Sequence, residues 1–363
     1  MNILVTGGCG FIGSAMVRKL LKNPATGRIV NLDLLTYCGN QASTEDASKD
    51  ARYQFVQGDI ADRELVAGLL AQHEINVVCH FAAQTHVDRS IEAPEEFVLT
   101  NVLGTMRLLE TTKTYWQRLP RVQREAFRFL HVSTDEVFGS LAPGDPPFSE
   151  TTRYDPRSAY AASKAAADHF VRAFGNTYGL PFLLTNCSNN YGPYQFPEKL
   201  LPLIILNALD RRLLPVYGDG LQRRDWLYVE DHIDAILRVL GNGRVGETYA
   251  IGGESEVTNL EIIQTICSIL DRQQPREDGI SYLEQMVHVT DRPGHDRRYS
   301  VSIRKIRNEL GWQPCGSLSS CLEKTVTWYR QNRAWCEMVL KDVYGRERLG
   351  SILPLTPQEN EST

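Results

Sequence analysis

The segment Gly7-Gly8-Cys9-Gly10-Phe11-Ile12-Gly13 directly follows a short apolar run at Ile3–Thr6 and opens an amphipathic segment at Phe11–Leu21. An apolar strand, a glycine turn and a helix in this order are typical of the first unit of a parallel sheet that binds a dinucleotide. Glycine lets the backbone turn tightly and approach a pyrophosphate, whose charge is stabilised at the helix N-terminus. We therefore expect cofactor contacts from Gly7, Gly10, Phe11, Ile12 and Gly13. A glycine turn required only for packing is the alternative.

A carboxylate, Asp33, ends the next apolar run, Ile29–Leu32, twenty residues after Gly13. At that place a carboxylate accepts hydrogen bonds from the adenosine ribose and repels a 2'-phosphate. The sequence therefore predicts NAD rather than NADP as the cofactor. Later strand ends offer Gly58-Asp59-Ile60 for the adenine and the small residues of Phe81-Ala82-Ala83 where the dinucleotide crosses the sheet.

Short apolar runs alternate with amphipathic stretches through the first part of the chain. The expected strands are Ile3–Thr6, Ile29–Leu32, Tyr53–Val56, Val77–Phe81, Phe129–Ser133 and Phe182–Asn186. The expected helices are Phe11–Leu21, Asp62–Ala71, Glu92–Thr112 and Ser158–Thr177. This alternation predicts an α/β fold, a Rossmann-type doubly wound parallel sheet with helices on both faces.

The pattern becomes irregular and rich in Pro, Tyr and Arg from Asn189 onward. We expect an NAD-binding domain at 1–188 and a smaller ligand-binding lobe, mainly at 189–349, with the chain returning to the sheet around 224–252. The candidate returning strands are Trp226–Tyr228 and Tyr249–Gly252. Helices are expected in the lobe at Glu198–Leu209, Asn259–Leu270 and Ser317–Tyr329. The polar, proline-containing end, 350–363, is expected to be flexible.

The composition excludes several classes of protein. The 363 residues carry a net charge of -5 without a basic run, so no nucleic-acid or anionic-membrane partner is indicated. No apolar run is long enough to span a bilayer, and the N-terminus lacks the features of a signal peptide, so we expect a cytoplasmic protein. The eight cysteines are scattered without metal-ligand spacing, so we expect reduced thiols and no metal site.

Two groups of residues carry the chemistry. Tyr160 and Lys164 are spaced i,i+4, so both side chains lie on one face of a helix, and a nearby ammonium should lower the pKa of the phenol. Thr134-Asp135-Glu136 follows an apolar run, with a hydroxyl that can bind the substrate oxygen that Tyr160 deprotonates. Taken alone, the first pair is more often a solvated helix face, and the second a polar strand exit. Beside a dinucleotide turn, both favour catalysis.

Further motifs extend along nearly the whole chain in one order. They are Thr6-Gly7-Gly8, Asp33-Leu34-Leu35-Thr36-Tyr37, His86-Val87-Asp88-Arg89-Ser90, Ser133-Thr134-Asp135-Glu136-Val137, Asn186-Cys187-Ser188-Asn189-Asn190-Tyr191-Gly192-Pro193-Tyr194, Phe196-Pro197-Glu198-Lys199-Leu200, Arg224-Asp225-Trp226-Leu227-Tyr228-Val229-Glu230-Asp231 and Asp291-Arg292-Pro293-Gly294-His295-Asp296. With these motifs the chain resembles the extended short-chain dehydrogenases/reductases, and specifically the nucleotide-sugar 4,6-dehydratases of the dTDP-glucose type.

The resemblance implies a hydro-lyase that uses NAD and a nucleoside-diphosphate glucose. Tyr160 would take the proton of the sugar 4-hydroxyl while Lys164 holds the phenolate and the nicotinamide ribose. Glu136 would then take the C5 proton, Asp135 would protonate the departing C6 hydroxyl, and hydride would return to C6. Neighbouring carboxylates in different environments can hold different protonation states, as such an elimination needs.

The resemblance also implies binding residues. Cofactor contacts are expected from Leu34, Thr36 and Thr100 in addition to Asp33, Asp59, Ile60, Phe81, Ala82, Ala83, Tyr160 and Lys164. Substrate contacts are expected from Thr85, Thr134, Asn189, Glu198, Lys199, Leu200, Pro215, Tyr217, Arg224, Asn259, Arg292 and His295. Among these, the guanidinium fork of Arg224 suits a diphosphate best, although an internal ion pair would also account for it.

Three questions stay open at this point. Gln84-Thr85 stands where the bacterial pattern often has glutamate and serine, so dTDP-glucose and UDP-glucose are both possible substrates. A nucleotide-sugar 4-epimerase would need the glycine turn and Tyr160 but not Asp135-Glu136, and a non-catalytic NAD-binding regulator would need neither catalytic group.

The family pairs long helices into a homodimer, and apolar stripes run along Glu92–Thr112 and Ser158–Thr177. These stripes (Phe97, Val98, Val102, Met106 and Leu109 in the first) could instead cover the sheet.

Overall fold

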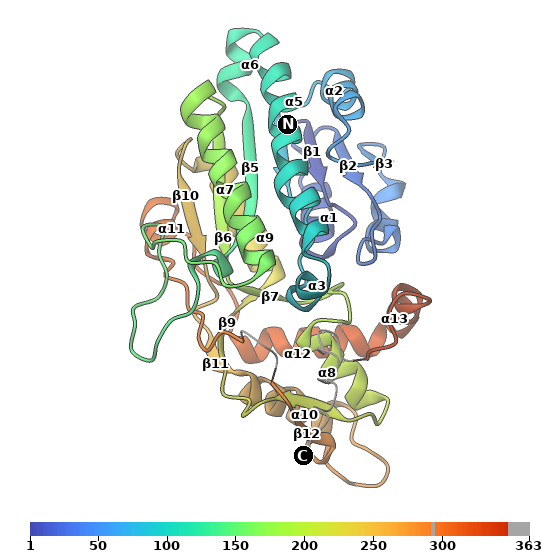
Figure 1. Ribbon diagram of the computed structural model, residues 1–363. Coiled ribbons are helices and arrows are strands. Elements are labelled where there is room, and N and C mark those ends of the chain that lie inside the picture. The colour runs from blue at the N-terminus through green and yellow to red at the C-terminus, as the bar shows by residue number, and fades with distance from the viewer. Residues whose placement is uncertain (292–294, 348–363) are drawn as a thin grey trace, which may run out of the picture.

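The computed structural model describes residues 1–291 and 295–347. In this part of the chain a seven-stranded parallel sheet has the order β10-β6-β5-β4-β1-β2-β3 (Figure 1). Its strands are β1 (Ile3–Thr6), β2 (Ile29–Asp33), β3 (Tyr53–Gln57), β4 (Val77–His80), β5 (Arg128–Thr134), β6 (Phe182–Cys187) and β10 (Thr248–Ile251). The chain reverses direction across the sheet after β3, which is the doubly wound arrangement that the sequence predicts.

Helices cover both faces of this sheet. One face packs against α1 (Phe11–Leu21), α9 (Val229–Asn242) and α11 (Arg304–Leu310), and the other against α2 (Arg63–Gln72), α5 (Thr105–Arg118) and α7 (Ala159–Tyr178). Successive residues of β1 show why. Ile3 and Val5 lie in the core on the side of α1, and Leu4 lies in the core on the opposite face of the sheet. Side chains alternate along a strand, so a run that is apolar throughout needs cover on both sides. A short helix, α6 (Arg121–Ala126), precedes β5.

The helix expected over Glu92–Thr112 is confirmed from Pro94 onward, but it is broken at Ala93 and contains a π-helical turn. The structure has α3 (Val87–Glu92), α4 (Pro94–Phe97), a π-helix η2 (Val98–Gly104) and then α5. Ala93 has φ -135° and ψ 66°, and Pro94 begins the next helix at a position where its missing N–H costs nothing. Widened π turns often lie at functional sites, and Thr100 of η2 is one of the expected cofactor contacts.

The C-terminal lobe contains two small sheets. One has the order β11-β9-β7, with β7 (Asn189–Tyr191), β9 (Arg223–Tyr228) and β11 (Glu256–Thr258), and the other pairs β8 (Leu214–Tyr217) with β12 (Met286–Val289). The chain returns to the large sheet at β10, within the expected Tyr249–Gly252. Trp226–Tyr228 does not return there, because the backbone of β9 is paired with β7 and β11.

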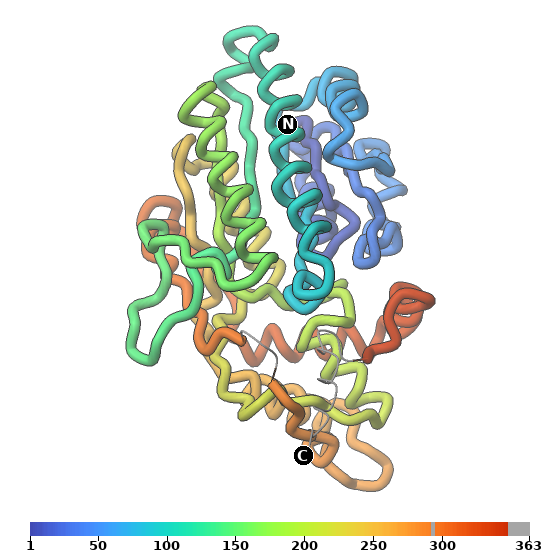
Figure 2. The backbone as a smooth tube through the Cα atoms, in the orientation of Figure 1, coloured from blue at the N-terminus to red at the C-terminus, as the bar shows by residue number. Residues whose placement is uncertain are grey.

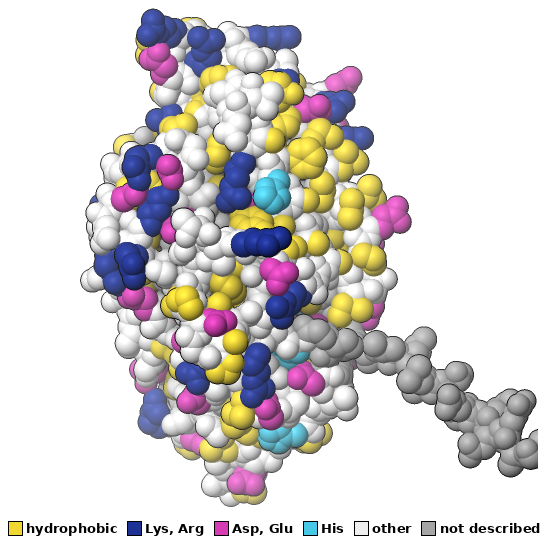
Figure 3. Space-filling view, turned by 60° about the vertical axis from the view of Figure 1, so that its left-hand side comes forward, with side chains coloured by type: hydrophobic (Ala, Val, Ile, Leu, Met, Phe, Trp, Pro, Cys, Tyr) yellow, Lys and Arg dark blue, Asp and Glu magenta, His cyan; other side chains and the backbone are white. Residues whose placement is uncertain are grey.

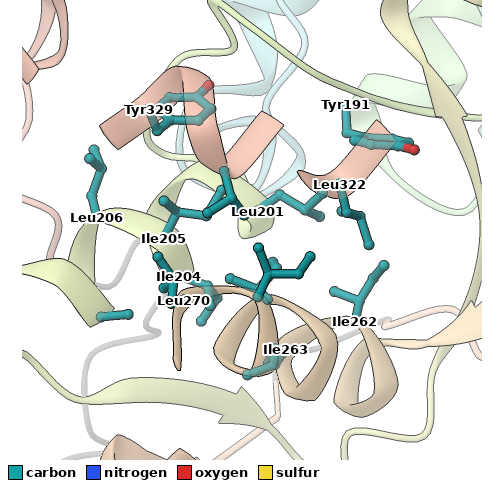
Figure 4. Packing of buried hydrophobic residues seen from close by; sticks show 14 of the residues in the cluster. Tyr191, Leu201, Ile204, Ile205, Leu206, Ile262, Ile263, Leu270, Leu322 and Tyr329 are labelled. Carbon is teal, nitrogen blue, oxygen red and sulfur yellow. The ribbon is translucent and has the colours of Figure 1, made fainter. Parts of the chain in front are cut away.

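The lobe has its own apolar core (Figure 4). Ile204 and Ile205 of α8 (Leu200–Leu209) point toward Ile263 and Leu270 of α10 (Asn259–Gln273), and α12 (Leu318–Gln331) closes the layer. The remaining elements are η1 (Gln41–Lys49), η3 (Asp135–Phe138), η4 (Tyr282–Gln285) and α13 (Arg333–Leu340). In Figure 2 the lobe lies below the large sheet, at the end toward which β1 runs. The expected flexible tail, 350–363, is outside the described residues.

The surface carries charges of both signs. Lysine and arginine side chains are interspersed with aspartate and glutamate over the face in Figure 3. Over residues 1–291 and 295–347, no helix has both the length and the apolar character needed to cross a bilayer. All eight cysteines are free.

Candidate active site

A cavity of about 290 Å³ lies at the carboxyl ends of the parallel strands. Carboxyl ends of parallel strands meet at one edge, which is where ligands bind in open α/β sheets. All of the expected cofactor contacts line this cavity: Gly7, Gly10, Phe11, Ile12, Gly13, Asp33, Leu34, Thr36, Asp59, Ile60, Phe81, Ala82, Ala83, Thr100, Tyr160 and Lys164. The reactive groups Thr134, Asp135 and Glu136 line it as well. Segments far apart in the sequence therefore form one site.

The glycine turn is shaped by close backbone contacts. Gly7 has φ +71°, and a Cβ there would lie 2.6 Å from the backbone nitrogen of Ala82. A Cβ on Gly13 would lie 2.2 Å from the carbonyl oxygen of Gly7. No side chain caps the N-terminus of α1, and its first turn has no acidic residue. This end of the helix therefore suits a pyrophosphate both sterically and electrostatically.

Asp33 is fixed at the end of β2 by two backbone donors. Its Oδ2 accepts a hydrogen bond from Cys9 N at 2.9 Å, and its Oδ1 accepts one from Leu35 N at 2.8 Å. Burial raises the pKa of this carboxyl, and the two backbone hydrogen bonds oppose that shift. Both oxygens keep a second lone pair, so the side chain can still accept a ribose hydroxyl.

Thr134 organises the turn that carries the two carboxyl groups. Its Oγ1 accepts a hydrogen bond from Glu136 N at 3.3 Å, which caps η3, and donates to Asp135 Oδ1 at 3.3 Å. Asp135 is 1% exposed, and its Oδ2 has no hydrogen-bond partner among the described residues. Burial raises the pKa of Asp135 well above its usual value, and the charges of Glu136 and Asp225 raise it further. Burial thus favours the protonated form of Asp135.

Tyr160 and Lys164 lie one turn apart on α7, as their spacing predicts. Both are buried, and Lys164 Nζ donates to the carbonyl oxygen of Val132 at 2.9 Å. The ammonium does not bring the pKa of the phenol below its usual value, because other effects outweigh it. Burial and then the charge of Glu136 raise the pKa of Tyr160 well above 10, although a hydrogen bond with Thr134 opposes them. Positive charge beside the phenol opposes this shift.

The sequence and fold match those of known enzymes. The pattern of the GDP-mannose 4,6 dehydratase family matches residues 4–325. The dTDP-glucose 4,6-dehydratase of Xanthomonas campestris pv. campestris (strain B100) is 54% identical over 350 residues, covering 96% of this chain and 99% of that protein. dTDP-glucose 4,6-dehydratase 1 of Escherichia coli (strain K12) is 51% identical, covering 95% and 97% of the two chains. The chain belongs to the dTDP-glucose 4,6-dehydratase family.

Solved structures show how far the fold of this dehydratase family is shared. DesIV, the dTDP-glucose 4,6-dehydratase of Streptomyces venezuelae, crystallised with NAD bound, has a TM-score of 0.84 at 43% identity, covering 93% of this chain and 100% of that chain. The UDP-glucose 4-epimerase of Thermotoga maritima has a TM-score of 0.80 at 28% identity, covering 92% and 100%. Dehydratase and epimerase thus share one fold, and only the groups in the site distinguish their reactions.

The expected substrate contacts of this family member divide into two sets. Thr85, Thr134, Asn189, Glu198 and Lys199 line the cavity. Leu200, Pro215, Tyr217, Arg224, Asn259 and His295 do not line it, and Arg292 is outside the described residues. Those outside the cavity lie in the lobe, where Leu200 begins α8 and Asn259 begins α10. Their contacts with a sugar nucleotide stay predictions.

Internal contacts hold several of these side chains in place. Glu198 accepts a hydrogen bond from the Tyr37 hydroxyl at 2.9 Å and one from Arg89 Nε at 3.2 Å. Lys199 Nζ donates to the carbonyl oxygen of Thr85 at 3.1 Å. Arg224 is 5% exposed, donates to the carbonyl of Asp296 at 2.9 Å and lies 4.3 Å from the Tyr299 ring centre. Its charge lowers the pKa of Asp135.

Some residues that line the cavity were not among the expected contacts. They include Cys38, Gly39, Cys187, Ser188, Asn190, Gln195 and Phe196. Most lie within the quoted motifs 186–194 and 196–200, which could have indicated them. The backbone of Gln84 is fixed by Asn101 of η2, which accepts from Gln84 N at 2.8 Å and donates to Ser163 Oγ at 2.9 Å. This contact between η2 and α7 depends on the π-helix, which periodicity did not reveal.

The raised pKa of Asp135 predicts how stability depends on pH. In the unfolded chain the Asp135 carboxyl ionises near pH 3.9. Above about pH 4 the folded protein therefore holds a proton on this carboxyl that the unfolded chain has released. The unfolding free energy contributed by this group therefore falls as pH rises toward the folded pKa. Asp135→Asn removes the titration, so its stability relative to the unsubstituted protein should rise with pH, by at most about 1.4 kcal/mol per pH unit, from about pH 5 up to the raised folded pKa of Asp135.

Chemical denaturation at several pH values measures this difference. Asp219→Asn is the control, because Asp219 is paired with Arg297 at 2.9 Å and its pKa is lowered by that hydrogen bond. It should destabilise by an amount that does not change over the same pH range. A pH-independent difference for Asp135→Asn would show that the carboxyl is already ionised in the folded protein.

Proposed function

We propose that this protein is an NAD-dependent dTDP-glucose 4,6-dehydratase, a hydro-lyase that forms the 4-keto-6-deoxy sugar. One observation carries the proposal: a buried Asp135, whose pKa is raised by burial, lies next to Glu136 in the same cavity as Tyr160 and Lys164. Elimination of water needs an acid and a base side by side, and oxidation of an alcohol needs a phenol supported by a cation. A 4-epimerase has no use for the carboxyl pair.

The described residues fit NAD. Gly7, Gly10 and Gly13 leave room for the pyrophosphate at the start of α1, and Asp33 can accept the ribose hydroxyl and disfavours a 2'-phosphate. When bound, NAD supplies the redox chemistry by accepting a hydride from C4 of the sugar and returning it to C6.

The residues then divide the remaining work. Tyr160 takes the proton of the 4-hydroxyl, and the Thr134 hydroxyl binds the same oxygen. The resulting 4-ketone acidifies C5–H, whose proton passes to Glu136, and the C6–O bond breaks as Asp135 donates its proton to the leaving hydroxyl. Water departs and a C5–C6 double bond remains. When C6 is reduced, Glu136 returns its proton to C5, so the product keeps the 4-ketone and gains a methyl group.

The fate of a label tests this reaction. Deuterium at C4 of dTDP-glucose should appear in the C6 methyl group of the product, and in deuterated water C5 should acquire solvent deuterium from the exchangeable Glu136 carboxyl. Proton NMR and mass spectrometry of the product measure both positions. UDP-glucose, run in parallel, tests the base preference that Gln84-Thr85 leaves open. A product that retains the label at C4 and keeps its C6 oxygen would identify an epimerase and refute the proposal.

Two variants test the division of labour. Tyr160→Phe should prevent formation of the reduced nicotinamide after substrate is added, because no base takes the 4-hydroxyl proton. Asp135→Asn combined with Glu136→Gln should still permit that reduction but slow the release of 4-keto-6-deoxy product by at least about 100-fold. Near-ultraviolet absorbance in stopped flow measures the reduction, and the alkali-induced absorbance of the keto sugar measures the product. Equal loss of reduction in both variants would contradict the assignment.

We also infer a homodimer and a cytoplasmic location. The free cysteines fit a reducing compartment. Two residues of the expected apolar stripe, Phe97 and Leu109, are buried within the protomer, as expected if the stripe covers the sheet. In contrast, Val98 is 53% exposed and its neighbour Leu99 is 51% exposed. Both lie on η2, which packs against α7, and Phe170 of α7 is exposed as well.

Sedimentation equilibrium tests the dimer. Val98→Lys with Leu99→Lys should shift the protein from dimer to monomer, because two buried ammonium groups would oppose association. Val343→Lys is the control, since Val343 is 42% exposed but lies beyond α13 in the C-terminal lobe. A double variant that sediments as the unsubstituted protein does would place the interface elsewhere.

A further inference from the structure

A buried polar cluster lies behind the reacting groups, between β5 and α7. It contains His131 of β5 and, one turn apart on α7, Lys164 and Asp168. His131 and Asp168 are fully buried, and Lys164 is 4% exposed. The proposed reaction uses Lys164 but assigns nothing to the other two.

The nearest partners of the Lys164 ammonium carry no negative charge. Its Nζ donates to the Val132 carbonyl at 2.9 Å and lies 3.5 Å from His131 Nε2. Burial lowers the pKa of His131 to about 4, so the ring is neutral. A buried ammonium surrounded by neutral groups tends to lose its proton, and burial does lower the pKa of Lys164.

Asp168 supplies the missing negative charge. Its Oδ1 lies 3.2 Å from His131 Nε2, so this nitrogen is close to both the Asp168 carboxylate and the Lys164 ammonium. Its Oδ2 accepts hydrogen bonds from Ser133 Oγ at 2.9 Å, Tyr154 Oη at 2.8 Å and Asn186 Nδ2 at 3.2 Å. Burial alone would raise the pKa of Asp168, but the contacts with His131, the charge of Lys164 and the Tyr154 hydroxyl hold it below its usual value. The carboxyl is therefore ionised.

The other titratable groups around the cluster do not replace this charge. The His80 ring lies 5.1 Å from that of His131, and burial lowers its pKa well below 6.5. Burial raises the pKa of Cys187 to about 12, so this thiol near Lys164 is neutral. Arg172 reaches Asp168 only through Tyr154, to whose hydroxyl it donates at 3.0 Å. On the side facing the cavity, burial raises the pKa of Asp135, which favours its neutral form, and Glu136 lies beside Asp135.

We propose that Asp168 is a positioning residue that keeps the Lys164 ammonium charged, with His131 between them, and so makes Tyr160 available as the base of the reaction proposed above. The inference rests on that reaction for its effect on catalysis, but the charge pair itself is a property of the folded chain. Ser133, Tyr154 and Asn186 hold the carboxylate at its place, and α7 fixes its spacing from Lys164.

The pH profile of Asp168→Asn tests the catalytic part. The substitution keeps the size of the side chain and removes its charge, so Lys164 should lose its proton at lower pH and Tyr160 should ionise less readily. The acidic limb of the pH profile of kcat/KM should shift to higher pH by about one unit. At a fixed pH on that limb, kcat/KM should therefore fall about tenfold. Tyr154→Phe removes a hydrogen bond from the same carboxylate but keeps its charge, so it should lower the thermal midpoint without moving the limb. An unmoved limb in Asp168→Asn would mark Asp168 as merely structural and overturn the proposal.

A substrate-free titration tests the charge pair. In ¹³C NMR of protein labelled at lysine Cε, the Lys164 resonance is assigned by its loss in Lys164→Met. Its pKa should fall by about one unit in Asp168→Asn and stay in place in Tyr154→Phe. An unchanged pKa in Asp168→Asn overturns the proposal. Because no substrate is needed, a shifted titration together with a failed product assay would refute the proposed function and leave this charge pair standing.

A double substitution covers the case in which Asp168→Asn folds poorly. Each single change leaves one buried charge without its partner, whereas Asp168→Asn with Lys164→Met removes both. The double variant should therefore have a higher thermal midpoint, or a larger soluble yield, than Asp168→Asn alone. No recovery in the double variant would show that the two groups are not coupled and would overturn the proposal.

Discussion

The parallel pairing of β5 between β4 and β6 is the constraint on which the site depends. Its register places His131 beside His80 and Thr134 beside Cys187. The carboxyl end of β5 therefore lies at the same edge of the sheet as those of its neighbours. Side chains alternate along β5: Leu130 and Val132 lie in the core on the α1 side, whereas His131 contacts α7. A slip of one residue would place apolar side chains beneath Lys164 and remove every polar contact there.

Burial then sets the protonation states that the chemistry starts from. Burial and the charge of Glu136 favour the protonated forms of both Asp135 and Tyr160. For Asp135 this is already the acidic form that elimination needs. For Tyr160 it opposes the ionised form that the proposed oxidation needs, whereas the Lys164 ammonium favours that form. The same desolvation therefore favours the second step of the proposed reaction and opposes the first.

The parts of the site predicted from sequence are those that lie in contiguous motifs at strand ends. The glycine turn, Asp33 and the Thr134-Asp135-Glu136 turn reach one cavity because parallel strands end at the same edge. The π-helix was missed because widened turns leave the apolar pattern nearly unchanged. The role of Asp168 was missed for another reason: its partners come from β5, β6 and a loop, and no local spacing encodes such contacts. The sign of the Tyr160 shift likewise depends on burial, which spacing does not reveal.

The proton balance of the proposed reaction gives Thr134 a further significance. Glu136 takes a proton from C5 and returns it, so it ends a turnover unchanged. Tyr160 ends with one proton more, from the 4-hydroxyl, and Asp135 ends with one fewer, lost with the departing water. A second turnover therefore requires the net transfer of one proton from Tyr160 to Asp135. The Thr134 hydroxyl donates to Asp135 Oδ1 at 3.3 Å and is also hydrogen-bonded with Tyr160. The residue that caps η3 thus stands between the group that must release a proton and the group that must regain one, so a single hydroxyl links the local fold of the turn to the completion of the cycle.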